Sequence, residues 1–263
     1  MIDAFFDLPL WISGTLIVLG LCLYSIAGLL FVRRCILPRL RIREVDGEFS
    51  GAMLQAVMVF YGLAVALISV SVWESYGEVS KTISQEATAI AALYRDVTSY
   101  PQPIRTQLQQ DLREYTDQII HEAWPMQKRG ETPTGGVALI DQFQRTLDTF
   151  EPATEGQKIL HSEALRAYNI LFQARRMRLD SVGTRLPGLL WFVIIVGAFI
   201  SLCSAFFFKI EDARLHGIQL TLLATFIGLI IFMILALDRP YHGELGLPAD
   251  PYQLIYDHLM VPE

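Results

Sequence analysis

Four long runs of apolar residues, separated by polar segments, dominate the pattern of the chain. They cover roughly residues 8–32, 52–73, 189–208 and 218–237, and none of them contains Asp, Glu, Lys or Arg. A bilayer core of about 30 Å needs about 20 helical residues to cross it. We therefore predict four membrane-spanning helices: Leu8–Val32, Ala52–Trp73, Leu189–Phe208 and Ile218–Leu237.

The polar segment between the second and third runs has helical periodicity. Its first apolar positions recur every three or four residues, at Val79, Ile83, Glu86/Ala87, Ile90, Tyr94 and Val97. No proline occurs between the second run and Pro101. We expect one continuous helix from about residue 52 to 99, with about half of its length outside the bilayer.

Further helices follow in the same segment, and no alternating strand pattern competes with them. Pro103 suits a first helical turn, the apolar stripe Ile104 to Ile119 follows it, and Thr154 with Gln157 forms a capping box. Near the C-terminus, Asp250 and Pro251 are expected as N-cap and first position of a short helix. The predicted fold class is all-α: a four-span membrane protein whose long helices extend into an extramembrane bundle. The predicted parts are 1–73 (two membrane helices), 74–188 (the outer bundle), 189–237 (two membrane helices) and 238–263 (a tail).

Composition agrees with a membrane protein and narrows the function. The chain is 52% hydrophobic and 18% charged, whereas soluble domains carry about 25% charged residues. Nucleic-acid-binding proteins carry basic surfaces, so a net charge of −6 argues against this function. Three cysteines are too few for a fold held by disulfides. His121-Glu122 lacks the second histidine of a zinc-protease helix, and no nucleophile–base pattern is present. We expect no enzyme activity, no metal and no cofactor.

Basic residues predict the orientation of the chain in a bacterial inner membrane. The short connection after the first span contains Arg33, Arg34, Arg39, Arg41 and Arg43. The short connection between the third and fourth spans contains Lys209 and Arg214. The N-terminal tail has none and the C-terminal tail has only Arg239. Short loops rich in Lys and Arg stay in the cytoplasm. Both termini and the outer bundle are therefore expected on the periplasmic side, with Trp11, Trp73 and Trp191 at the outer interface.

One face of the second membrane helix is made of small and polar residues. Its members are Gly51, Gln55, Gly62, Ala66 and Ser69. Two interpretations stay open: close packing against another helix, or the lining of a water-filled pore. Glu74 and Glu78 follow directly. They are either a ring of charge at the pore mouth or an ordinary solvated part of the helix.

The apolar stripe from 79 to 97 bears on assembly, because a solitary projecting helix would leave it in water. Contact between copies of the chain would cover the stripe, and so would packing against other outer helices of the same chain. The first explanation predicts a homo-oligomer.

Two short motifs support a family resemblance. They are Gln85-Glu86-Ala87 through Leu93-Tyr94-Arg95, and Asp238-Arg239-Pro240-Tyr241 followed at one residue's distance by Gly243. The Asp–Arg pair either simply ends the fourth span or is fixed to the outer helices by an ion pair. Together the motifs resemble a bacterial membrane family with a bestrophin-like domain, over roughly residues 10–250. The resemblance implies a four-span membrane protein. True bestrophins are pentameric anion channels with an apolar neck and an acidic calcium clasp. The chain lacks both features, so neither calcium gating nor anion selectivity is carried over.

The function predicted from these features is an ion-conducting pore or gated cavity, formed by a homo-oligomer and lined by helix two. Its expected partners are the lipid bilayer, further copies of itself and small ions. The alternative is a non-conducting sensor or scaffold whose outer bundle binds a partner. A water-filled path along Gln55–Ser69 would favour the pore, and a dry seam with a groove on the bundle would favour the sensor.

Overall fold

The computed structural model describes residues 9–39, 44–207, 212–243 and 246–261. Five residues used in the predictions above lie outside these ranges: Leu8, Arg41, Arg43, Phe208 and Lys209. The chain forms two compact units. Unit 1 comprises Met1–Glu74 and Arg185–Asp238, and unit 2 comprises Ser75–Thr184 and Arg239–Glu263.

Each predicted span corresponds to a long apolar helix. The helices are α2 (Leu10–Phe31), α3 (Glu44–Asp96), α8 (Gly188–Phe206) and α9 (Ala213–Asp238). Each is long and apolar enough to cross a bilayer, and together they confirm the expected all-α membrane fold. The single helix predicted from 52 to 99 is also confirmed, since α3 runs for 53 residues and a short 3-10 turn, Val97–Ser99, follows it.

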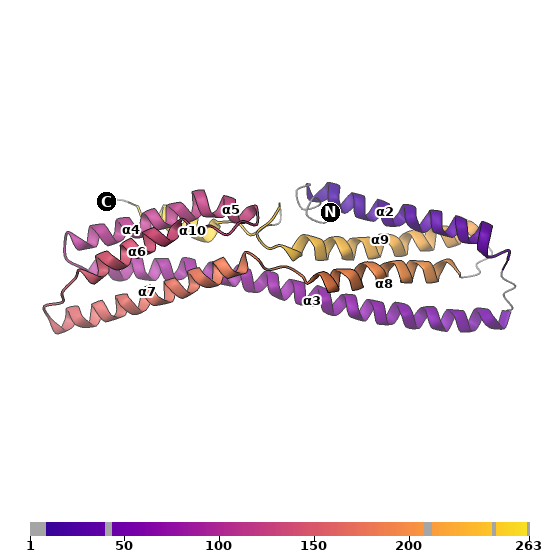
Figure 1. The fold of residues 1–263 in the computed structure, drawn as a ribbon, viewed down its shortest axis with the longest axis horizontal. Helices are drawn as coiled ribbons and strands as arrows, with labels where there is room; N and C mark the ends of the chain where they lie inside the picture. Colours follow the sequence, from indigo (N-terminus) through magenta and orange to yellow (C-terminus); the bar gives the residue numbers. More distant parts are fainter. Residues whose placement is uncertain (1–8, 40–43, 208–211, 244–245, 262–263) are drawn as a thin grey trace. The chain divides into compact units, whose positions relative to one another are not determined.

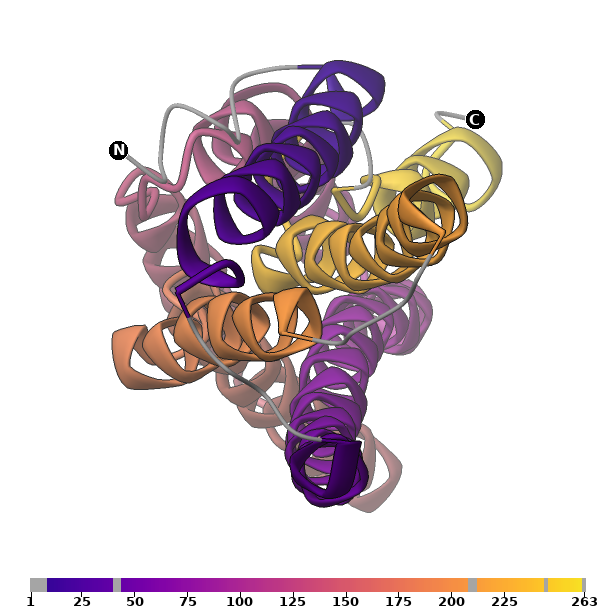
Figure 2. The ribbon, with the colours of Figure 1, turned by 90° about the vertical axis from the view of Figure 1, so that its right-hand side faces the viewer.

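Unit 1 is a four-helix arrangement in which α9 and α8 lie between α2 and α3 (Figures 1 and 2). Glycines allow close approach at two of the helix contacts. A Cβ on Gly228 of α9 would lie 3.1 Å from the Val18 Cα of α2, and one on Gly197 of α8 would lie 2.5 Å from the Tyr61 ring of α3. The Tyr61 hydroxyl also donates to the Ile194 carbonyl at 3.1 Å. Small residues therefore set the contacts of both α2 and α3 with their neighbours.

Unit 2 is a helical bundle built around the C-terminal part of α3. Its remaining helices are α4 (Ile104–Gln118), α5 (Trp124–Lys128), α6 (Gly136–Asp148), α7 (Glu155–Ser181) and α10 (Asp250–His258), with a π-helical segment, Ile119–Ala123, joining α4 to α5. Thr154 and Gln157 form the predicted capping box at the start of α7. The prediction for α10 was one residue off: Ala249 is its N-cap, and Asp250 is its first residue.

The apolar stripe of α3 is buried within the chain itself. Val79, Ile83, Ile90 and Val97 are each at most 3% exposed, in one core with residues of α4, α6, α7 and α10. The other helices of the same chain therefore cover it. This corrects the argument for an oligomer drawn from the stripe, which gives no information on assembly.

Candidate functional site

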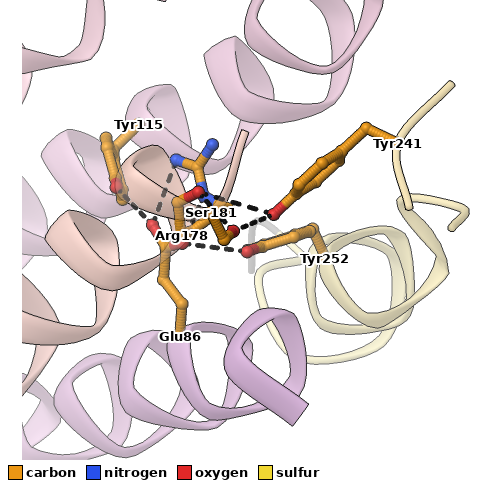
Figure 3. Close-up of polar contacts among 6 residues, drawn as sticks. All are labelled: Glu86, Tyr115, Arg178, Ser181, Tyr241 and Tyr252. Carbon is orange, nitrogen blue, oxygen red and sulfur yellow. Dashed lines mark hydrogen bonds and ion pairs between the residues drawn. The ribbon is translucent and has the colours of Figure 1, made fainter. Parts of the chain in front are cut away.

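A buried carboxylate lies at the centre of unit 2. Glu86 of α3 is 0% exposed, and its two oxygens accept bonds from three other helices (Figure 3). The Tyr115 hydroxyl of α4 donates to Oε1 at 2.7 Å, and the Tyr252 hydroxyl of α10 donates to Oε2 at 2.9 Å. The Arg178 guanidinium of α7 donates from Nη2 to Oε1 at 3.2 Å and from Nε to Oε2. We call these four residues the Glu86 cluster.

Helical periodicity places each member of the cluster on a buried face. Glu86 follows Val79 and Ile83 on the stripe of α3, and Arg178 follows Tyr168 and Leu171 on the buried face of α7. Each of the four helices thus contributes one polar group to the cluster. A buried charge without a partner costs several kcal/mol, so the two charges stabilise the fold only as a pair.

A second set of hydrogen bonds extends the cluster to the start of the C-terminal tail. The Ser181 and Tyr241 hydroxyl oxygens are 2.8 Å apart, and Ser181 donates to the Arg178 carbonyl at 2.7 Å (Figure 3). The Tyr241 ring lies against Trp124, with ring centroids 5.6 Å apart. Tyr241, and Tyr252 in α10, are therefore both hydrogen-bonded to residues of the bundle.

The electrostatics agree with a buried ion pair whose two charges cancel. Burial lowers the pKa of Arg178, but the Glu86 charge and hydrogen bond, together with Tyr252 and Tyr115, outweigh burial and hold that pKa well above its usual value. Burial, and secondly the Glu86 charge, raises the pKa values of Tyr115 and Tyr252 well above their usual range. Both hydroxyls therefore stay protonated and donate to the carboxylate at any physiological pH. The cluster offers no exposed acid, base or nucleophile, and its geometry is that of a tether between helices.

The residues of the family motifs do not form one site. Glu86 is in the cluster, Tyr94 is half-buried beside the same core, and Arg95 is exposed. In unit 1 the Asp238 carboxylate accepts from the Leu186 backbone N–H and from the Trp191 indole at 3.2 Å.

The second half of the tail motif forms a turn in unit 2. Arg239 is half-buried and Pro240 and Tyr241 are buried. Gly243 has φ of +72°, a conformation that favours glycine. The Leu247 N–H closes the turn by donating to the Pro240 carbonyl at 2.8 Å. Tyr241, in the same segment, lies within hydrogen-bond distance of Ser181.

The predicted pore face of α3 lies on the surface of unit 1. Gln55, Gly62 and Ala66 are exposed, and no atom lies within 4 Å of a Cβ built on Gly62. Gly51 is half-buried, as is Ser69, whose hydroxyl donates to the Val65 carbonyl of its own helix at 2.8 Å. Helices of the same chain therefore do not cover the middle of this face.

The two predicted mouth charges are exposed but lie beside this face. Glu74 and Glu78 are on α3, just beyond Trp73. At 3.6 residues per turn, Glu74 lies about 80° and Glu78 about 120° around the helix from Ala66. Their role as a ring of charge stays a prediction.

The Glu86–Arg178 pair was not predicted from the sequence. Arg178 and Glu86 are 92 residues apart, and no local pattern indicates which helices meet. A signal was present, however: each is a charged residue at a position where the helical period requires an apolar one. Tyr115 likewise lies on the expected stripe of α4.

Fold and site together define an all-α, multi-pass membrane protein in which a buried ion pair holds the helical bundle of unit 2. The model of the family described as "Bestrophin-like domain" matches residues 19–252, and the chain belongs to this family. Neither a curated protein nor a solved structure matches the chain. The family is associated with channels rather than with enzymes.

Proposed function

We propose that the protein forms a homo-oligomer in the bacterial inner membrane, and that the exposed small-residue face of α3 lines an ion-conducting path or gated cavity. The observation that carries the proposal is the open face at Gln55, Gly62 and Ala66, which no other helix of the described chain covers. An amide in hydrocarbon needs a partner or water. Contact with further copies around a wet path satisfies Gln55.

The position of α3 in unit 1 supports the proposal. Among the four spans, α3 has the lowest buried share, and it lies at the opposite side of the unit from α2 (Figure 2). Its small face is flanked by large exposed apolar residues such as Leu63, Leu67 and Val70. In an assembly that buries these large apolar residues in lipid or against a neighbouring copy, the small-residue face of α3 lines the ion-conducting path.

A second candidate function rests on a groove in unit 2. A hollow of about 1260 Å³ is lined mainly by polar residues of α4, the end of α3 and α10, among them Arg95, Arg105 and Arg113. The Arg113 guanidinium carbon lies 4.3 Å from the centre of the Tyr256 ring. Such a groove suits a sensor or scaffold whose outer bundle binds a partner.

Cysteine accessibility separates the two functions. In a background with Cys22, Cys35 and Cys203 replaced, Gly62→Cys and Ala66→Cys should react with a small charged thiol reagent in the intact assembly. The matched control is Leu67→Cys, which follows Ala66 directly and is 65% exposed in the single chain. It should stay unreactive because its face meets lipid or protein. Modification at 62 or 66 should also block ion flux into liposomes.

Equal lack of reaction at 62, 66 and 67 would contradict the pore and favour the sensor. An exposed position, Thr132→Cys, confirms that the reagent is active.

The same Thr132→Cys variant tests the proposed orientation. Because unit 2 is proposed to be periplasmic, this thiol should react with a membrane-impermeant reagent in spheroplasts without permeabilisation. A reaction that occurs only after the inner membrane is permeabilised would place unit 2 in the cytoplasm and reverse both termini.

A further inference from the structure

A narrow pocket lies in unit 2, and Arg178 is one of its lining residues. Its lining residues come from α4, from α7, from the segment that joins α4 to α5, and from the start of α6 and the loop before it. They are Tyr115, Gln118, Ala123, Pro133, Gly136, Arg175, Arg178 and Leu179. The lining contains two arginines and no carboxylate.

Both arginines have unused donors. Arg178 is 1% exposed, and its Nη1 has no hydrogen-bond partner although Nε and Nη2 bind Glu86. Arg175 is 7% exposed, its Nε is buried without a partner, and it forms no ion pair with any residue that the structure describes. Burying an unpaired guanidinium is costly, so a second anion beside Glu86 would stabilise the site.

A helix N-terminus faces the same space. Gly136 is the first residue of α6, which is 13 residues long, and no side chain caps it. The free N–H groups of a first turn carry partial positive charge and bind anions. The Arg175 Nη2 atom lies 3.6 Å from the position that a Cβ on Gly136 would take. Arg175, Arg178 and the start of α6 therefore converge, and Glu86 neutralises only one of the two guanidinium charges.

We propose that this space is a binding site for a small monovalent anion, held by Arg175, by Arg178 Nη1 and by the first-turn N–H groups of α6. In the side-chain arrangement described, the space is too narrow for a water molecule. Binding therefore requires a flexible group to rotate, and the Gln118 amide, 3.0 Å from the Cβ position of Gly136, is the nearest one. The anion is a structural ligand of unit 2, and the inference does not depend on ion conduction.

Thermal unfolding of the purified full-length protein tests the site, with sodium chloride or sodium formate replacing sodium gluconate at constant ionic strength. Gluconate is too large to enter. A ligand that binds only the folded state raises Tm, by a few degrees at roughly tenfold excess over Kd. We expect a rise of about 3 °C that grows with the logarithm of the anion concentration, both in the wild type and in Arg176→Gln, whose side chain is 77% exposed on the same helix. Arg175→Gln should lose the rise.

A second variant keeps the test decisive if Arg175→Gln does not fold. Gly136→Ala retains both arginines but puts a methyl group into the space, 3.0 Å from Gln118 Oε1 and 3.3 Å from the Tyr115 ring. It should also lose the rise. No anion-dependent shift in the wild type, or an undiminished shift in Gly136→Ala, would overturn the inference.

Discussion

Removing the charge of Glu86 should unfold unit 2 at a much lower temperature. Glu86→Gln keeps the size of the side chain, but it leaves Arg178 charged, 1% exposed and without a carboxylate. The amide also presents an NH₂ group to donors where the carboxylate presented an acceptor. Breaking one side of a buried ion pair costs about 3–5 kcal/mol. For a unit of this size the loss corresponds to a fall in Tm of roughly 10 °C or more.

Trp124 provides a local probe for this measurement. Its indole donates to the Leu247 carbonyl at 3.1 Å, and its ring centroid lies 5.5 Å from that of Tyr252. Thermal unfolding would be followed by fluorescence in a background where Trp11, Trp73 and Trp191 are phenylalanine. The signal then reports on unit 2 alone.

Two further variants identify the cause of the loss. Asp180→Asn removes the exposed partner of Arg176, where the nitrogen–oxygen distance is 3.9 Å, and it should leave Tm unchanged within error. The double variant Glu86→Leu with Arg178→Met removes both charges, and it should be more stable than Glu86→Gln. The reasoning is refuted if Glu86→Gln unfolds within about 1 °C of the wild type, because that result would mean the pair is not buried.

Three other predictions follow from single contacts. Burial raises the pKa of Tyr252 well above 10, so the unfolded state loses the hydroxyl proton at a lower pH than the folded state does. The free energy of unfolding should therefore be constant from pH 7 to 9 and fall above about pH 10. The fall should be less steep in Tyr252→Phe. Gly197→Ala should lower Tm, at a cost of about 1–3 kcal/mol, because its Cβ would lie 2.5 Å from the Tyr61 ring. The control Gly62→Ala should not lower Tm, because its Cβ would meet no described atom within 4 Å. Thr154→Ala removes the capping box of α7 and should cost about 1 kcal/mol in chemical unfolding, with Thr154→Ser close to wild type.

The sequence was sufficient for features that depend on local chemistry. Four spans follow from uninterrupted apolar length, and the start of α7 follows from Thr154 and Gln157, because bilayer thickness and helix capping are local constraints. The boundary of α10 was missed by one residue, because Ala249 has no side chain that signals an N-cap.

Tertiary contacts could not be predicted in this way. The stripe from Val79 to Val97 favoured an oligomer over packing within the chain, and only the packing of α4, α6, α7 and α10 shows that the chain covers it itself. The partner of Glu86 depends on which helices meet, and hydrophobic periodicity contains no such information. The sequence does allow one prediction for Glu86: a carboxylate on the buried face of a helix requires a hydrogen-bond or ion-pair partner.

The central claim, that the small-residue face of α3 lines a path within a homo-oligomer, is tested most directly by an electron cryo-microscopy map of the protein in lipid nanodiscs. We predict several copies arranged about one axis, with Gln55, Gly62 and Ala66 of each copy facing a water-filled path. A monomer, or an assembly in which these residues face lipid or pack tightly against a neighbouring helix, would contradict the claim.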